Sequence, residues 1–177
     1  VDVLKQAIRA WQTVLAEPVT IHVDGTPFSV TPRMIRRARG RARSSRRPHN
    51  RARQMFHDTL VEEIVEAYAA EIGTDPERPD RPGMLLSRSD IADLTEDLLH
   101  SPEVQSLVDE HWPILTAERV VTRLLTERTH AEDACAGILP AGDIDFLLRP
   151  EGNPFTVADV PLLDEAAEQL GRPPRSQ

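Results

Sequence analysis

Apolar residues recur at helical spacing along most of the chain, and this pattern predicts a mainly α-helical protein. A first helix is expected over residues 3–15, before Pro18, and the longest runs from Asn50, its expected N-cap, to Gly73. Shorter helices are expected where apolar faces are formed by Ile91, Leu94, Leu98 and Leu99; by Val104, Leu107 and Trp112; by Val120, Val121, Leu124 and Leu125; by Ile144, Phe146, Leu147 and Leu148; and by Leu162, Leu163, Ala166 and Leu170.

One stretch has the alternation of a β-hairpin instead. Asp24-Gly25 separates two alternating runs within residues 19–30, and this dipeptide favours a two-residue hairpin turn. Such a turn places Ile21 opposite Phe28 and Val19 opposite Val30. We therefore predict a mainly α fold, a multi-helix domain with one small β-hairpin.

Residues between these apolar patterns predict where helices begin and end. Thr31-Pro32 predicts a helix with a threonine N-cap and proline at its first position. Further expected starts are Ser87 with Asp90, Ser101 with Pro102, Thr116, and Thr156 with Asp159, and Gly171 is an expected stop.

A proline-rich stretch over residues 73–83, GTDPERPDRPG, contains no apolar side chain and suggests a loop between two lobes. The expected organisation is an N-terminal lobe over 1–72, a loop or linker over 73–84, a C-terminal helical lobe over 85–171, and a tail over 172–177.

Charge changes the picture, because a chain of formal net charge −8 carries ten arginines and no acidic residue between Arg33 and Arg53. Such a segment can neutralise nucleic-acid phosphates, with an affinity that falls steeply as salt increases. It can equally pair with acidic protein surfaces or remain solvated. No aromatic residue is interleaved with the arginines, so base stacking is not indicated. On chemistry alone, a protein partner and nucleic acid remain equal alternatives.

The sequence contains no pattern of residues that indicates an enzyme. The chain has neither GxxxxGK nor GxGxxG, no GxSxG, and no HExxH, and its six histidines show no ligand spacing. Asp164-Glu165 imitates a Walker B acidic pair, but Pro161, helical periodicity and Gly171 predict an ordinary helix there. The single cysteine, Cys135, excludes a disulfide framework and is consistent with a reducing cytoplasm. No apolar run is long enough to span a membrane. Because the chain begins at Val1 rather than Met, we expect either a processed protein or, in preference, a fragment of a longer one.

Three stretches resemble HelD-like helicases of superfamily 1, relatives of UvrD and Rep. These are RRPHNRAR (46–53), DEHWPILTAERVVTRLL (109–125) and NPFTVADVPLLDEAAEQLG (153–171), in the family's order and spacing. Phe155 stands where the family pattern has Trp. The motif positions that carry the resemblance, with an expected structural role, are Pro48, His49, Asn50, Trp112, Pro113, Thr116, Thr156, Asp159, Pro161 and Asp164.

The resemblance implies an insertion within the first motor domain of a helicase that acts on RNA polymerase. Such an insertion contacts the polymerase, helps to open its clamp or channel, and so promotes release of nucleic acid and recycling of the enzyme for transcription. The isolated chain is then expected to be non-catalytic and without cofactor or metal, while ATP and Mg belong to the parent protein, a cytoplasmic helicase.

The expected partners are RNA polymerase and the remainder of the motor, with no membrane contact. The expected contact residues are Arg33, Arg36, Arg37, Arg41, Arg46 and Arg47. The alternative function is a DNA- or RNA-binding module that uses the arginine-rich segment 33–53.

Overall fold

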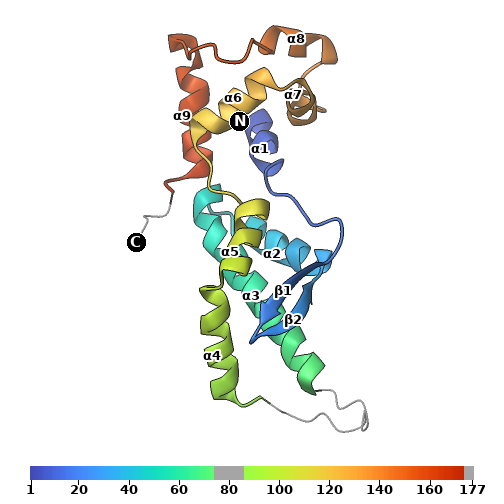
Figure 1. Cartoon of the computed structure of the whole chain (residues 1–177). Coiled ribbons are helices and arrows are strands. Elements are labelled where there is room, and N and C mark those ends of the chain that lie inside the picture. Colours follow the sequence, from blue (N-terminus) through green and yellow to red (C-terminus); the bar gives the residue numbers. More distant parts are fainter. Residues whose placement is uncertain (74–85, 174–177) are drawn as a thin grey trace. The chain divides into compact units, whose positions relative to one another are not determined.

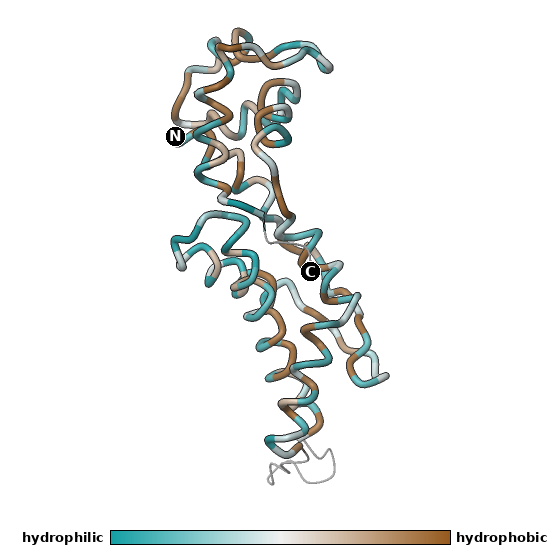
Figure 2. Tube along the Cα trace, turned by 90° about the vertical axis from the view of Figure 1, so that its left-hand side faces the viewer, coloured by the Kyte–Doolittle hydropathy of each residue, from teal (hydrophilic) through white to brown (hydrophobic). Residues whose placement is uncertain are grey.

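The computed structural model describes residues 1–73 and 86–173 (Figure 1). These residues are mainly helical, with one two-stranded antiparallel sheet, which confirms the fold class expected from the sequence. Along the helices, hydropathy alternates between polar and apolar positions, as expected when one helix face is buried (Figure 2). The predicted loop at 73–84 and tail at 172–177 lie almost entirely outside the described residues.

The chain divides into two compact units, each assembled from segments that are not consecutive. Unit 1 comprises Val1–Thr13, Arg46–Arg53 and Pro113–Gln177, and unit 2 comprises Val14–Ser45 and Gln54–Trp112. These units differ from the lobes 1–72 and 85–171 expected from the sequence, because α1 packs with helices from the C-terminal third of the chain, whereas α5 packs with the hairpin. The longest helix, α3 (His49–Gly73), contributes its first residues to unit 1 and the rest to unit 2.

Unit 1 is a cluster of short helices around one apolar core. Its elements are α1 (Asp2–Arg9), α6 (Ala117–Thr126), α7 (Arg128–Cys135), η1 (Ala141–Asp143), α8 (Ile144–Leu147), η2 (Val157–Asp159) and α9 (Val160–Leu170). Helix α1 packs against α6, α7 and α9, and α6 packs against α7 and α9. Buried residues of the core include Leu4, Leu115, Leu124, Cys135 and Leu170. The thiol of Cys135 is therefore a core group, and burial raises its pKa.

The first helix is shorter than predicted, ending at Arg9 rather than near residue 15. The amides of Trp11 and Gln12 bond three residues back, to Ile8 and Arg9, so the last turn tightens and the helix stops. Both side chains have tertiary contacts within unit 1. The guanidinium groups of Arg119 and Arg123 lie 4.5 and 4.4 Å from the centre of a Trp11 ring, within cation–π range.

Unit 2 combines the hairpin with helices. Its elements are β1 (Val19–Val23), β2 (Thr26–Val30), α2 (Pro32–Ser44), most of α3, α4 (Arg88–Leu99) and α5 (Pro102–His111). The hairpin register is the predicted one, with Val19 opposite Val30 and Ile21 opposite Phe28. Asp24 and Gly25 take positive φ angles of 50° and 74°, as a two-residue hairpin turn requires. Val19 lies on the same face as Ile21 and Val23 but, at the strand end, is 37% exposed.

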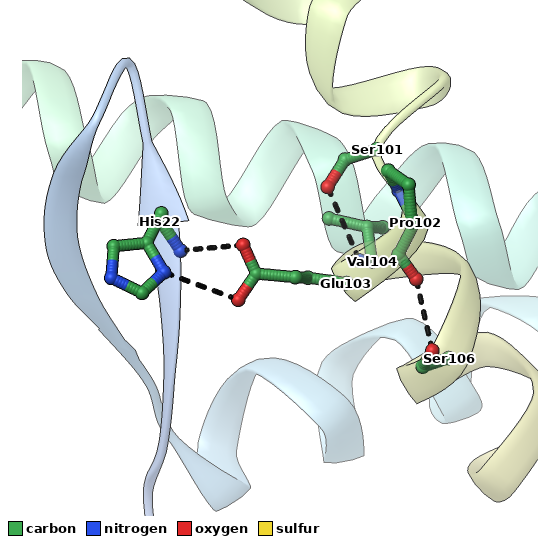
Figure 3. A network of polar contacts seen from close by, with 6 residues as sticks. All are labelled: His22, Ser101, Pro102, Glu103, Val104 and Ser106. Carbon is green, nitrogen blue, oxygen red and sulfur yellow. Dashed lines mark hydrogen bonds and ion pairs between the residues drawn. The ribbon is translucent and has the colours of Figure 1, made fainter.

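His22 of the hairpin and Glu103 of α5 make two polar contacts (Figure 3). The backbone N–H of His22 in β1 donates to Oε1 of Glu103 at 3.1 Å, and its Nδ1 lies 3.3 Å from Oε2. Ser101 caps the same end of α5 by accepting from the amide of Val104. The carboxylate of Glu103 therefore joins the first turn of α5 to strand β1.

Five of the helix starts expected from polar residues are confirmed. Thr31, Ser101 and Thr116 each accept a hydrogen bond from a backbone amide three residues on. Ser87 with Asp90 and Thr156 with Asp159 form reciprocal capping boxes. The predicted cap at Asn50 is wrong: α3 begins at His49, and the Asn50 side chain bonds elsewhere.

Candidate interaction surface

The most concentrated charge in unit 2 is on α2. Its 13 residues hold six arginines and no acidic residue. Arg33, Arg36, Arg37 and Arg41 are all exposed. They share the side of the helix opposite Ile35, Ala38 and Ala42, which are buried. We call this exposed side, with Gly40 and Ser44, the arginine face.

The arginine face is only partly neutralised from within unit 2. Arg37 Nε lies 3.2 Å from Oε1 of Glu63 on α3 and forms an ion pair. Within the described ranges, Arg33, Arg36 and Arg41 form no ion pair. Three guanidinium groups are therefore available to a partner molecule.

Arg46 and Arg47, the other two predicted contact residues, are exposed but belong to unit 1. Arg46 follows the C-cap of α2, Ser45, and has a φ of 55°. This left-handed conformation at the end of a helix is usually taken by glycine. The six predicted contact residues are thus divided, with four on α2 in unit 2 and two in unit 1.

The motif residues Pro48, His49 and Asn50 form a polar junction inside unit 1. The amide nitrogen of Asn50 donates to the carbonyls of Leu115 and Gly171 at 2.9 and 3.0 Å, and its Oδ1 accepts from the Leu115 amide at 3.0 Å. A Cβ placed on Gly171 would be 2.7 Å from Cβ of Pro48, so this crossing needs glycine. Asn50 therefore joins the three stretches on which the resemblance rests.

His49 is buried in the same junction. Gln12 Nε2 donates to His49 Nδ1 at 3.1 Å, so the ring is in its Nε2–H form and donates to the carbonyl of Pro113 at 2.7 Å. Burial lowers the pKa of His49 from 6.5 to about 4, and the positive charge of Arg53 acts in the same direction. The residue is a neutral structural group, with no exposure to a substrate.

The Trp-Pro-x-Leu-Thr stretch also packs and caps. Trp112 is buried in unit 2 and stacks on Phe56 with ring centres 5.6 Å apart. Pro113 supplies the carbonyl that His49 binds in unit 1. Thr116 accepts from the Arg119 amide at 3.2 Å and starts α6.

The third motif places Asp159 in a dense set of hydrogen bonds. Its carboxylate accepts from the Thr156 amide at 2.7 Å and is held by both terminal nitrogens of Arg149. The Arg149 guanidinium and the Thr156 amide hold the pKa of Asp159 well below its usual range. Pro161 and Asp164 follow at the start of α9 and are exposed.

Asp164 and Glu165 lie on α9, which confirms the prediction that this acidic pair belongs to a helix and not to a Walker B strand. In the described part of the chain, no three His, Cys, Asp or Glu side chains come close enough together to hold a metal ion.

A feature that the sequence did not predict is a set of exposed apolar residues in unit 1. Phe146, expected on the buried side of its helix, is 90% exposed, and Val157 is 88% exposed. Helix α8 has only four residues, so Ile144 occupies its one inward position and Phe146 points away. The short spacing between Pro140 and Pro150 was the available signal for so short a helix.

A scan against protein-family models and a search of curated proteins found no match to this chain. None of the helices within residues 1–73 and 86–173 combines the length and apolar character needed to cross a lipid bilayer.

Proposed function

We propose that the chain is a non-catalytic insertion domain of a cytoplasmic HelD-like helicase, and that its arginine face contacts RNA polymerase to help open the clamp or channel and release nucleic acid. The single observation that carries this proposal is the set of exposed guanidinium groups of Arg33, Arg36 and Arg41, which form no ion pair among the described residues. The resemblance of three stretches to the family supplies the identity of the partner.

The arginine face gives α2 little stability. Arg33 lies in the first turn, where the helix dipole disfavours a cation. The pairs Arg33 with Arg37 and Arg37 with Arg41 are four residues apart, and each like-charge pair destabilises a helix by about 0.2–0.5 kcal/mol. Only Arg41, in the last turn, is favoured by the helix dipole, and only Arg37 of this face pairs with a carboxylate of α3, so a contact outside the chain is the better explanation for the arginine face.

The proposal also assigns the other expected partner. Unit 1 carries the exposed apolar side chains of Phe146 and Val157, which are available for contact with another protein. We assign unit 1 to the remainder of the motor and the arginine face of unit 2 to the polymerase.

The test is binding of the purified chain to core RNA polymerase, and in parallel to short single- and double-stranded DNA, over a series of salt concentrations. We expect saturable polymerase binding that weakens when Arg33, Arg36 and Arg41 are all replaced by Gln. Arg88→Gln, an exposed arginine of α4 in the same unit, is the control and should bind like the parent chain.

Two results would contradict the proposal: unchanged polymerase binding by the triple variant, or ATP turnover by the pure chain. ATP and Mg are expected to act only in the motor of the parent protein.

The second candidate function is a nucleic-acid-binding module using segment 33–53, favoured by the six arginines of α2. This function requires DNA binding in which the logarithm of the binding constant falls linearly with the logarithm of the salt concentration. Neutralising three phosphates corresponds to a slope of about −3. Against it, α2 carries no aromatic residue on which bases could stack.

A further inference from the structure

The centre of the arginine face has no side chain. Gly40 lies in the middle of α2, where a glycine costs about 1 kcal/mol relative to alanine. A Cβ placed on Gly40 would meet nothing within 4 Å, and its φ is not positive. Neither packing nor backbone conformation within the described residues therefore explains this glycine.

Ser44 lies one turn further along the same face, and its hydroxyl donates to the Gly40 carbonyl at 2.9 Å. The hydroxyl is thus folded back on the helix. Three arginines lie around Gly40 on the helix surface: Arg36 and Arg37, four and three residues before it, and Arg41, directly after it. Gly40 and Ser44 are therefore two small residues, four positions apart, among the arginines of this face.

We propose that an acidic α-helix of a partner protein packs across α2 at Gly40, with its carboxylates paired to Arg33, Arg36 and Arg41. Small residues four apart allow two helix backbones to approach closely. Arg33 and Arg41 are separated by about 12 Å along the axis at 1.5 Å per residue, and glutamates at positions i, i+4 and i+8 of a facing helix span the same length. Guanidinium–carboxylate pairs add directional hydrogen bonds.

A protein helix fits this face better than nucleic acid. Arg37 already pairs with Glu63 of α3, so carboxylates on a helix are the partners this face has within the described residues. Unit 2 holds 17 acidic and nine basic residues, and six of those nine are on α2, so the rest of the unit carries a formal charge of −14. That charge repels an extended phosphate polymer but is compatible with a single helix of limited length.

This inference specifies which kind of structure binds the arginine face. It rests on the proposed function only for the statement that the acidic helix belongs to RNA polymerase. The probe is an alanine-rich helical peptide with glutamate at every fourth position, labelled for fluorescence anisotropy. A peptide of the same composition, with its glutamates distributed around the helix, is the matched control. A single-stranded DNA oligonucleotide of equal charge is the third ligand.

We expect the one-sided acidic peptide to bind more tightly than the distributed peptide and the DNA, and to shift the backbone amide signal of Gly40. Gly40→Leu should weaken peptide binding about tenfold while raising the thermal stability of the chain, since α2 has room for the side chain. Gly142→Leu is the control, since Gly142 is also unobstructed and has no positive φ, and peptide affinity should not change. Arg36→Gln with Arg41→Gln should also weaken binding about tenfold.

Equal binding of the two peptides, or full affinity of Gly40→Leu, would overturn the helix-docking inference. Tighter binding of the DNA would overturn it in favour of a phosphate contact. If the peptide fails while core polymerase still binds in a manner that depends on Arg33, Arg36 and Arg41, only this inference is wrong. If the peptide binds at Gly40 and polymerase does not, the inference stands and the proposed function is wrong.

Discussion

Arg46 has a backbone conformation that costs stability. Its φ of 55° is unfavourable for a residue with a Cβ by roughly 1 kcal/mol. We expect Arg46→Gly to raise the midpoint of thermal unfolding, corresponding to a stabilisation of about 1 kcal/mol. Arg46→Ala removes the same charge but keeps the unfavourable φ, so it should show no such increase. An equal increase in both variants would assign the effect to the charge.

His49 makes the stability of the chain depend on pH. Its pKa is lowered from 6.5 to about 4 by burial, so the unfolded chain binds more protons than the folded chain between these values. The stability associated with His49 is full above pH 6.5 and is lost as pH falls toward 4. The loss is about 3 kcal/mol, from 1.36 kcal/mol for each pKa unit.

Urea unfolding at a series of pH values measures this dependence, and His49→Gln is the matched variant. Glutamine does not titrate, so the variant should lose much of the slope between pH 6.5 and 4. Part of the slope should remain, because burial also lowers the pKa of His130. A variant with the full slope of the parent chain would show that His49 is not the titrating group.

At the scale of the element, the polar residues at helix starts have local and separable effects. Ser87 accepts from the Asp90 amide at 3.1 Å, and the Asp90 carboxylate accepts from the Ser87 amide at 2.8 Å. Ser87→Ala should cost about 1 kcal/mol and fray the first turn of α4. Amide hydrogen exchange at Asp90 measures this directly. Ser89→Ala, in the same exposed turn but not at the cap, should leave the exchange rate unchanged.

Elements specified by neighbouring residues were predictable from the sequence. The hairpin register follows from the positive φ angles that Asp24 and Gly25 can take. The helix starts follow from hydroxyl groups three residues before the amides they bind and from carboxylate groups three residues after the amides they bind. The errors involve tertiary contacts. The predicted first helix was too long because Gln12 and Trp11 are held by residues far along the chain, and Asn50 bonds to Leu115 and Gly171 instead of capping its own helix.

The candidate site was predicted to a similar extent. Four of the five exposed arginines of α2 could be identified as contact residues from the sequence because charge and helical spacing are both local. The ion pair of Arg37 could not be identified from the sequence, because its partner Glu63 lies 26 residues further along the chain. The exposure of Phe146 was also not predictable from periodicity, because a four-residue helix is too short to define a face.

At the scale of the whole molecule, the segments of the two units are interleaved in the sequence. Residues 46–53 of unit 1 lie between the two segments of unit 2. Composition alone favoured a boundary within residues 73–84, because proline-rich stretches commonly separate domains. Composition does not report contacts between the first and last helices of unit 1, so the sequence could not define the compact units.

Fragments provide a test of this interleaving. Residues 1–72 and 85–177 each contain parts of both units, so we expect neither fragment to fold alone. Mixing the two should restore dispersed amide resonances and a cooperative thermal transition, with a chain cleaved in the same stretch as the control. A cooperative transition of fragment 1–72 by itself would contradict the assignment of units.

The order of the segments also determines the order in which a ribosome can complete the two units. Unit 2 has all of its residues once Trp112 has emerged, whereas unit 1 lacks α9 until Leu170 has been made. At 5–20 residues per second, that interval is roughly 3–12 s. During it, the apolar side of α1, with Leu4, Ala7 and Ile8, has no completed core to enter, so we expect chaperones to bind the nascent chain until α9 has been made.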